Sequence, residues 1–311
     1  MTTTLHFAQL TDIHLTRAPH TWGTLGTESG DLLRQTIAEL NQTADLDFVL
    51  ITGDAIDAAT SEEIELFNSI MKGLEKPWHF VPGNHDGYNA PNHPETLPAH
   101  EATPLIDPRL AAPVPYVQKA YWSRLVKPGV QLIGLDSRMD DTFNGMIDAD
   151  QLAWLERELE AHRDELALIA AHHPLYDLNP INKREWWCNF ICDNGKEVEA
   201  VLDRYPNARM VLTGHHHANQ IRRRSGRLHV STSALTGYPC TYRTVRLTRQ
   251  GDGWRVQVES RSPASDGLVK KAYDLLAKSE IARQFAPDDP ASWADFCAGG
   301  PEDRSFDGLL P

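Results

Sequence analysis

Five short clusters of polar residues in this sequence contain side chains that bind metals. In chain order they are Asp12/His14, Asp54, Asn84/His85/Asp86, His172/His173 and His215/His216/His217. Aspartate and histidine are ligands for borderline divalent metals, and asparagine supplies a neutral oxygen. Side chains alternate along an extended segment, so residues two apart share a face and adjacent residues do not. The D-x-H and H-x-H spacings therefore each predict two ligands for one site, with His216 pointing away from it.

Seven of these side chains are candidate metal ligands: Asp12, His14, Asp54, Asn84, His172, His215 and His217. One tetrahedral ion takes four ligands, so seven candidates fit two ions that share a ligand. Two ions about 3.5–4 Å apart hold both the attacking and the leaving oxygen of an in-line displacement. The set therefore predicts phosphoester chemistry.

Each cluster lies at the end of a segment that is predicted to be a strand. The first segment is 5–10, which precedes Asp12. The other four are 47–54, 78–86, 166–174 and 208–217, and each of these ranges includes its polar cluster. Helical spacing of apolar residues at 31–41 and 61–74 separates the first three, which gives a β–α–β–α–β order and an at least partly parallel sheet. Ligands bind at the carboxyl ends of strands in such sheets. We therefore expect the five clusters to meet at one sheet edge.

The remaining segments predict an α/β domain followed by a helical extension. Further strands are predicted at 130–137, 227–233, 242–248 and 254–260, the last three as an antiparallel meander, and further helices at 148–162, 196–206 and 267–285. Residues 88–115 are predicted to be a long loop, and 175–195 an irregular insertion near the site. The catalytic domain is therefore expected to span 1–262. Residues 263–311 are expected to form a C-terminal helical extension that packs on it or mediates homo-oligomer formation.

Composition excludes several kinds of partner. The 311 residues carry a formal net charge of −13, which repels nucleic acid and anionic membranes. No window approaches the roughly 18 apolar residues of a membrane helix, and the first 15 residues lack the basic and apolar regions of a signal peptide. We therefore expect a cytoplasmic protein that binds neither nucleic acid nor membrane. The 4 cysteines are too sparse for a disulfide framework.

The motifs together resemble a known family. "TDIH", "TGD", "PGNHD", "AHHP" and "TGHHH" are similar, in order, to the pattern of the calcineurin-like metallophosphoesterases, and the resemblance runs from Leu5 to Asn219. It implies a four-layer α/β/β/α sandwich of two mixed sheets flanked by helices. It also implies two divalent metal ions, of which manganese, iron, zinc and cobalt are the candidates.

The resemblance assigns the ligands to two sites. One metal is implied to take Asp12, His14, Asp54 and His217. The other is implied to take Asp54, Asn84, His172 and His215, with Asp54 bridging. In matching members the first histidine of "HHP" is the ligand, which selects His172 over His173.

The resemblance also implies a mechanism in which a metal-bridging hydroxide attacks phosphorus in line. His85 is expected to stay off the metals, to face the substrate and to protonate or stabilise the leaving oxygen. Asp86 is expected to orient or support His85 from behind. Gly83 is expected to permit the tight turn that places Asn84.

Within the family, the segments "GMIDADQLAWLERELE" and "ICDNGKEVEAVLDRYPNARMVLTGHHH" resemble bacterial class III cyclic-nucleotide and glycerophosphodiester phosphodiesterases. The sequence therefore predicts a phosphodiesterase for small phosphodiesters. The alternatives are a phosphomonoesterase, a nucleotide pyrophosphatase or a phospholipid head-group hydrolase on the same site, and more remotely a non-enzymatic binding scaffold.

No residue is assigned to substrate binding from the sequence. Trp22, Trp186 and Trp187 could line the substrate pocket, cap the core or form a subunit contact. The run from Arg222 to Arg224 could steer phosphate, although a solvated hairpin is the more ordinary interpretation.

Overall fold

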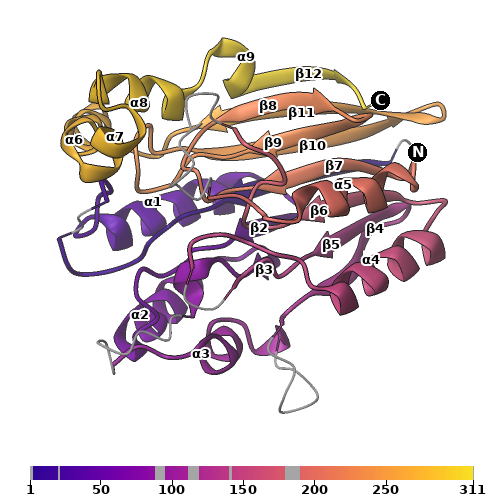
Figure 1. Ribbon diagram of the computed structural model, residues 1–311, viewed down its shortest axis with the longest axis horizontal. Coiled ribbons are helices and arrows are strands. Elements are labelled where there is room, and N and C mark those ends of the chain that lie inside the picture. The colour runs from indigo at the N-terminus through magenta and orange to yellow at the C-terminus, as the bar shows by residue number, and fades with distance from the viewer. Residues whose placement is uncertain are drawn as a thin grey trace.

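Two six-stranded sheets pack face to face in the computed structural model, which describes residues 3–19, 22–87, 95–110, 119–139, 142–178 and 190–310 (Figure 1). The first sheet has the order β12-β11-β10-β1-β2-β3 and comprises Ser305–Leu309, Gly253–Arg261, Tyr242–Gln250, Thr4–Leu10, Phe48–Thr52 and Trp78–Val81. The second has the order β4-β5-β6-β7-β9-β8 and comprises Trp122–Lys127, Val130–Gly134, Leu166–Ala170, Ala208–Thr213, Arg227–Ser231 and Gln220–Arg224.

Helices cover both outer faces of the sandwich. Helices α1 (Ser29–Gln42), α2 (Ser61–Met71) and α3 (Ala99–Ile106) share an apolar core with the first sheet. Helices α4 (Ala149–Ala161) and α5 (Gly195–Asp203) pack on the second. A third core lies between the sheets and includes Phe7, Phe48, Leu132 and Met210. The layer order confirms the predicted α/β/β/α fold, because each sheet buries one face on helices and the other on its partner sheet.

The central strands run parallel in both sheets. Strands β1, β2 and β3 are mutually parallel, and so are β5, β6, β7 and β9, whereas β10 and β4 run antiparallel to their neighbours. The strands buried on both faces have the continuous apolar sequences expected of parallel strands.

Two topological expectations are corrected. The polar clusters do not share one sheet edge, because β1, β2 and β3 lie in the first sheet and β6 and β7 in the second. The predicted meander is also split between the sheets. Strand β9 pairs with β7 and β8 in the second sheet, while β10 and β11 form a hairpin in the first. Periodicity identifies strands but not the partner strand, which depends on long-range packing.

The C-terminal segment contains more elements than the one predicted helix. The helix predicted at 267–285 is interrupted at Ser279. The extended backbone of this residue (φ −68°, ψ 161°) separates α6 (Asp266–Lys278) from α7 (Glu280–Phe285). The Ser279 hydroxyl accepts a hydrogen bond from the Ala282 amide and so caps α7. Helices α8 (Pro290–Ala298) and α9 (Pro301–Arg304) follow, and β12 then pairs with β11.

Helices α6, α7 and α8 form a group at one end of the two sheets (Figure 1). They share an apolar cluster that contains Leu276, Phe285, Trp293 and Cys297. None of the helices among the described residues is long and apolar enough to cross a membrane.

Candidate metal centre

The predicted ligands lie in the loops that follow the strands, not in the strands themselves. Strand β1 ends at Leu10, β2 at Thr52 and β7 at Thr213. Nine non-glycine residues among those described have positive φ, and five of them are predicted ligands: Asp12, His14, Asp54, His215 and His217. Strand alternation is therefore not the reason that these side chains converge. Left-handed backbone at alternate loop residues turns them inward, and such strain is typical of functional sites.

One group of ligands forms around the Asp12 carboxylate. Its Oδ1 lies 3.3 Å from His217 Nε2 and 3.9 Å from His14 Nε2. The Nε2 atoms of His14 and His217 are 3.1 Å apart, and Asp54 Oδ2 lies 3.7 Å from His14 Nε2. The four side chains predicted for the first metal therefore converge.

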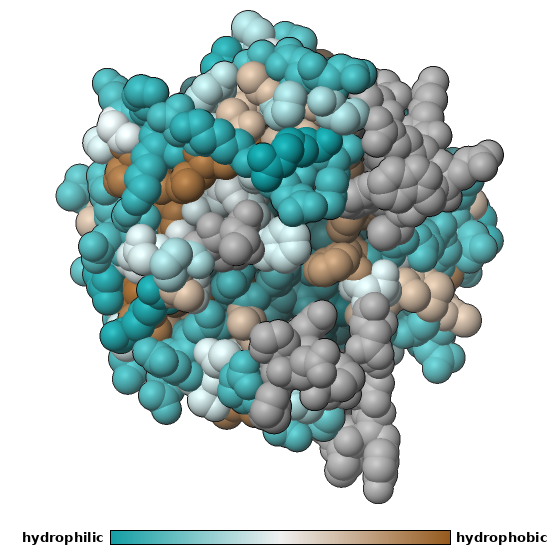
Figure 2. All heavy atoms as spheres, turned by 60° about the vertical axis from the view of Figure 1, so that its left-hand side comes forward, coloured by the Kyte–Doolittle hydropathy of each residue, from teal (hydrophilic) through white to brown (hydrophobic). Residues whose placement is uncertain are grey.

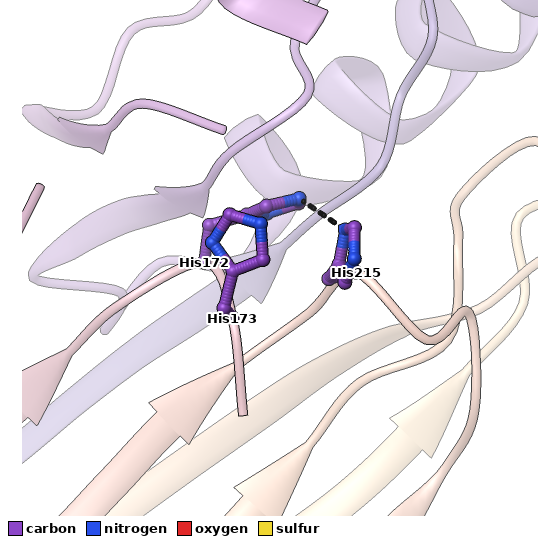
Figure 3. Close-up of side chains that lie close together, drawn as sticks. All are labelled: His172, His173 and His215. Atoms are coloured by element: carbon purple, nitrogen blue, oxygen red, sulfur yellow. Dashed lines mark hydrogen bonds between the residues drawn. The ribbon is translucent and has the colours of Figure 1, made fainter. Parts of the chain in front are cut away.

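A second group forms on the other side of Asp54. Its Oδ2 is 3.1 Å from His172 Nε2, so this one oxygen faces both groups. Figure 3 shows His172 and His215 pointing toward each other, with His172 Nε2 3.1 Å from His215 Nδ1. Loops of both sheets thus contribute to this group, because Asp54 follows β2 whereas His172 and His215 follow β6 and β7.

Two buried polar atoms lack hydrogen-bond partners at this site. Among the described residues, none donates to Asn84 Oδ1 and none pairs with His215 Nε2. An unsatisfied buried carbonyl oxygen costs free energy unless it binds something else, and a metal ion satisfies it. The donor set of carboxylate, imidazole and amide oxygen therefore fits divalent cations.

The ligand histidines are held in orientations that suit metal binding. His172 Nδ1 donates a hydrogen bond to the Thr52 carbonyl at 2.8 Å, so Nε2 is the nitrogen that loses its proton when the ring binds a metal. His14 Nδ1 lies 3.2 Å from Asp57 Oδ1, which fixes the same tautomer. Such contacts on the far ring nitrogen are typical of metal-ligating histidines. Sequence reasoning missed Asp57, although it lies only three residues after Asp54.

The pKa values of the groups at the centre reflect their burial and the two carboxylates. Burial lowers the pKa of His14 to about 4, so its ring is neutral near pH 7. Although burial opposes its charge, the carboxylates of Asp54 and Asp12 raise the pKa of His172 to about 9. The pKa of Asp54 lies well below its usual range despite its burial, because the His172 and His85 rings lie close to it. The two carboxylates therefore create a field that favours a cation.

His85 lies beside the predicted ligands, and its hydrogen bonds are made to Asp57 and Asp54. Its Nδ1–H donates to the Asp57 carbonyl, and its backbone N–H donates to Asp54 Oδ1 at 2.8 Å. The ring packs edge-on to His14, with 4.6 Å between the ring centroids, and lines the cavity above the centre. Burial lowers the pKa of His85, but the Asp54 and Asp57 carboxylates outweigh it and raise the pKa overall.

The hydrogen bonds of Asp86 are made to backbone amides and not to the His85 ring. Its fully buried carboxylate accepts hydrogen bonds from four backbone amides, those of Gly83, Asp54, Ala55 and Ile56. The oxygen that fixes the His85 ring is instead the backbone carbonyl of Asp57. Asp86 therefore ties the loop after β3 to the loop after β2, and it supports His85 by charge, because its carboxylate is one of the groups that raise the pKa of His85.

Gly83 has a different role from the one predicted. Its φ of −104° and ψ of 178° are extended values that any residue adopts. A Cβ at this position would lie 2.2 Å from Asp54 Oδ1 and 2.6 Å from the Asp54 amide nitrogen. The glycine is required because the two loops approach each other too closely for a side chain.

The two histidines that follow ligands in the sequence have their own partners. His173 Nδ1 lies 2.7 Å from the Ser137 hydroxyl, and its Nε2 lies 3.1 Å from the Phe143 carbonyl. His216 Nε2 lies 2.9 Å from the Phe190 carbonyl. Because a carbonyl oxygen can only accept, both Nε2 atoms are donors and are not available as metal ligands, although the His173 ring lies close to His172 and His215.

A cavity of about 320 Å³ opens above the centre. Its lining includes predicted ligands, His85 and Trp22, which supports the pocket interpretation of this tryptophan. Apolar side chains lie in recessed parts of the mostly hydrophilic face that Figure 2 brings forward. Trp186 and Trp187 lie outside the described residues. Arg222 and Arg224 form ion pairs with Asp303 and Glu199 and do not line this cavity.

Fold and site together define a hydrolase of phosphoesters. The family model for calcineurin-like phosphoesterases matches residues 5–219, and the chain belongs to that family. Among solved structures, a dimetal phosphatase from Danio rerio has a TM-score of 0.62 at 16% identity, with 84% of this chain and 97% of that chain covered. A purple acid phosphatase from yellow lupin has a TM-score of 0.56 at 14% identity, with 86% and 52% covered. These two similarities show the fold.

Curated relatives are named as bacterial phosphodiesterases. The chain is 30% identical over 237 residues to a 3′,5′-cyclic-nucleotide phosphodiesterase of Nostoc sp., covering 75% of this chain and 79% of that protein. It is 26% identical over 277 residues to the 3′,5′-cyclic adenosine monophosphate phosphodiesterase CpdA of Haemophilus influenzae, covering 88% and 90%. A probable glycerophosphodiester phosphodiesterase of Arcobacter nitrofigilis is 30% identical over 129 residues, covering 41% and 42%.

Proposed function

We propose that this protein is a binuclear-metal phosphodiesterase that hydrolyses small phosphodiesters of the cyclic-nucleotide or glycerophosphodiester type. The observation that carries the proposal is the Asp54 carboxylate, whose Oδ2 faces His14 at 3.7 Å and His172 at 3.1 Å and so joins two groups of ligands. Asp12, His14, Asp54 and His217 would hold one cation, and Asp54, Asn84, His172 and His215 the other. Bound divalent cations would supply Lewis acidity and lower the pKa of a nucleophilic water.

The protein's own groups would then act on the leaving oxygen. Because His85 Nδ1–H is committed to the Asp57 carbonyl, its Nε2 is the nitrogen available to the cavity. From this position a protonated Nε2 would donate to the leaving oxygen, as a general acid does. Asp86 would fix the backbone of Asp54 and Gly83 and support the charge on His85.

Diesters are favoured over monoesters and pyrophosphates by the charges near the cavity. A monoester dianion or a second phosphate calls for additional cationic side chains. Among the described residues that line the cavity, none is a lysine or an arginine. We therefore rank the phosphomonoesterase, pyrophosphatase and head-group hydrolase alternatives below a phosphodiesterase, and assign the protein to the cytoplasm as the compartment of its small-molecule substrates.

The test is hydrolysis of bis(p-nitrophenyl) phosphate and p-nitrophenyl phosphate by protein reconstituted with manganese, iron, cobalt or zinc. We expect hydrolysis that depends on metal and favours the diester. Absence of activity with every metal would refute the proposal, and a preference for the monoester would favour the alternative. Metal analysis of the purified protein is expected to give about two ions per chain, the number that the seven ligands accommodate.

A further inference from the structure

The cavity above the metal centre has a polar floor and an apolar wall. Ligands and His85 form the floor. The wall consists of residues far apart in the sequence: Trp22, Phe143, Phe190, Leu276, Ile281, Phe285 and Trp293. Four of these seven come from helices α6, α7 and α8, which lie over the same end of the sheets as the ligand loops (Figure 1). The C-terminal helices therefore form part of the substrate cavity.

Aromatic rings in the wall form a continuous series that leads to a metal ligand. Trp293 stacks on Phe285 with 4.4 Å between ring centroids, and Phe285 lies 5.6 Å from Phe190. Phe190 in turn lies 5.8 Å from Phe143 and 5.9 Å from the His215 ring. These separations are those of interacting aromatic rings.

The two phenylalanines are held by the histidines next to the ligands. His173 donates to the Phe143 carbonyl and His216 to the Phe190 carbonyl, at 3.1 and 2.9 Å. Phe190 also has a φ of 48°, a conformation that a bulky residue adopts only when its surroundings enforce it. Each histidine pair thus places one imidazole at the metal centre and uses the other to position a ring of the wall.

Polar groups are few in this wall. Among its described residues beyond the floor, the groups that can form hydrogen bonds are the side chains of Gln284 and His216 and the indole N–H groups of Trp22 and Trp293, and His216 already binds the Phe190 carbonyl. A polyol such as glycerol would bury hydroxyl groups with few partners, at a cost in binding free energy. A flat aromatic group buries apolar surface instead and can stack on the rings.

From this arrangement we infer that the wall binds an aromatic, nucleobase-sized substituent of the substrate, and that helices α6 to α8 select for it. The inference rests on the proposed phosphodiesterase function and narrows its substrate class to diesters with an aromatic substituent. His173 and His216 are positioning residues for this subsite. The cavity volume of about 320 Å³ suits one small ligand.

Binding of two diesters that differ only in their substituents tests the inference. Diphenyl phosphate and dimethyl phosphate are titrated into manganese-loaded protein by calorimetry, and each is also used to inhibit hydrolysis of bis(p-nitrophenyl) phosphate. We expect diphenyl phosphate to bind at least about tenfold more tightly, from the apolar area that one ring buries. Equal affinities would overturn the inference. Because the hydrolysis assay is separate, failure of the proposed function would appear there as loss of turnover.

Variants of the wall distinguish specific binding of the aromatic substituent from non-specific hydrophobic binding. Ile281→Gln and Phe190→Leu are expected to weaken diphenyl phosphate binding by about fivefold or more and to leave dimethyl phosphate binding unchanged. Phe285→Leu keeps an apolar side chain in the helical cluster, so it loses the ring without a large cavity. Leu125→Gln, at a side chain that is 58% exposed on β4 and away from the cavity, is the control and should change neither affinity. Equal weakening of both ligands would contradict the inference.

The positioning role of His216 is tested by the effect of its substitution on KM and kcat. His216→Leu removes the donor to Phe190, and should raise the KM for bis(p-nitrophenyl) phosphate while metal content and kcat stay close to wild type. His216→Gln restores a donor and should recover part of the affinity. Loss of metal in His216→Leu, or a fall in kcat alone, would show that His216 serves the metal centre and not the wall.

Discussion

Individual side chains at this centre have separate roles that their types do not reveal. The motif Asn84-His85-Asp86 is the clearest case, because three adjacent polar residues point to three places. Asn84 presents an unsatisfied oxygen to the centre, the His85 ring bonds to Asp57, and Asp86 binds backbone amides. The sequence motif predicts that all three matter, but only the fold shows what each one contacts.

His85→Ala and Asn84→Ala should lose different properties, kcat in the first and metal content in the second. His85 makes no ligand contact in the proposed site, so His85→Ala should retain both metals and lose about 10²–10⁴-fold in kcat. Asn84→Ala should lower metal content by up to one ion per chain. Metal analysis alongside bis(p-nitrophenyl) phosphate kinetics checks both. If His85→Ala loses metal while Asn84→Ala retains it, the two assignments are reversed.

Gly83→Ala should damage the centre although alanine fits the local backbone. The new methyl group would lie 2.2 Å from Asp54 Oδ1, so the Asp54 carboxylate must move. We expect lower metal content and at least about a tenfold loss of activity, since small displacements at a metal centre are costly. Gly267→Ala is the matched control, because its nearest neighbour would be 4.0 Å away. Wild-type metal content in Gly83→Ala would contradict this account.

At the scale of elements, loops rather than strands carry the site. Strands β1, β2, β3, β6 and β7 end just before their ligands, and in the loops after β1, β2 and β7 the ligand residues adopt left-handed conformations that aim their side chains inward. The sequence predicts these strands well because they are short and mostly apolar, and β2 and β6 are almost continuously so. Loop conformation depends on contacts between loops, such as those of Asp86, which no local pattern contains.

Asp86→Asn should destabilise the junction of the loops after β2 and β3. Its two carboxylate oxygens each accept two backbone N–H bonds, and an amide group would turn one acceptor into a donor facing N–H groups. We expect a loss of about 2–4 kcal/mol in the free energy of unfolding. Urea unfolding in the presence of a chelator measures this loss of stability, because the chelator removes any contribution from bound metal. Asp31→Asn on the exposed surface of α1 is the control and should have little effect.

The loop after β5 should make stability sensitive to acid. Although burial raises its pKa, the Arg138 guanidinium lowers the pKa of Asp136 to about 2, below its ordinary value of 3.8. A depressed pKa contributes stability above about pH 4, and this is lost as the pH falls toward 2; the contribution is about 2 kcal/mol. The stability difference between wild type and Asp136→Asn should therefore shrink over this pH window. A difference that stays constant would contradict the assignment.

For the whole molecule, the site joins the two sheets. Asp12, His14, Asp54 and Asn84 follow strands of the first sheet, whereas His172, His215 and His217 follow strands of the second. The C-terminal segment also connects the layers, because β12 extends the first sheet while Asp303 of α9 accepts a hydrogen bond from the Ile221 amide on β8. The predicted boundary near residue 262 remains a prediction, as does oligomer formation.

Removal of metal should therefore lower the stability of the entire domain. Ligands that bind only the folded state add about 2.7 kcal/mol per site at one hundred times Kd. We expect the Tm to fall on chelation and to recover when manganese is restored, as measured by calorimetry. His172→Ala, which removes a second-site ligand, should show a smaller recovery. An unchanged Tm on chelation of metal-loaded protein would contradict the idea that the ions join the sheets.

The sequence by itself determined the family, the layer composition and the seven candidate ligands, because motifs and apolar runs are local patterns. Tertiary structure alone decided which sheet each strand joins, that Asp86 holds backbone while the Asp57 carbonyl holds His85, and that the C-terminal helices line the cavity. The physical reason is that these features arise from contacts between segments distant in the chain. The local preferences of a residue do not indicate which distant segment will pack against it.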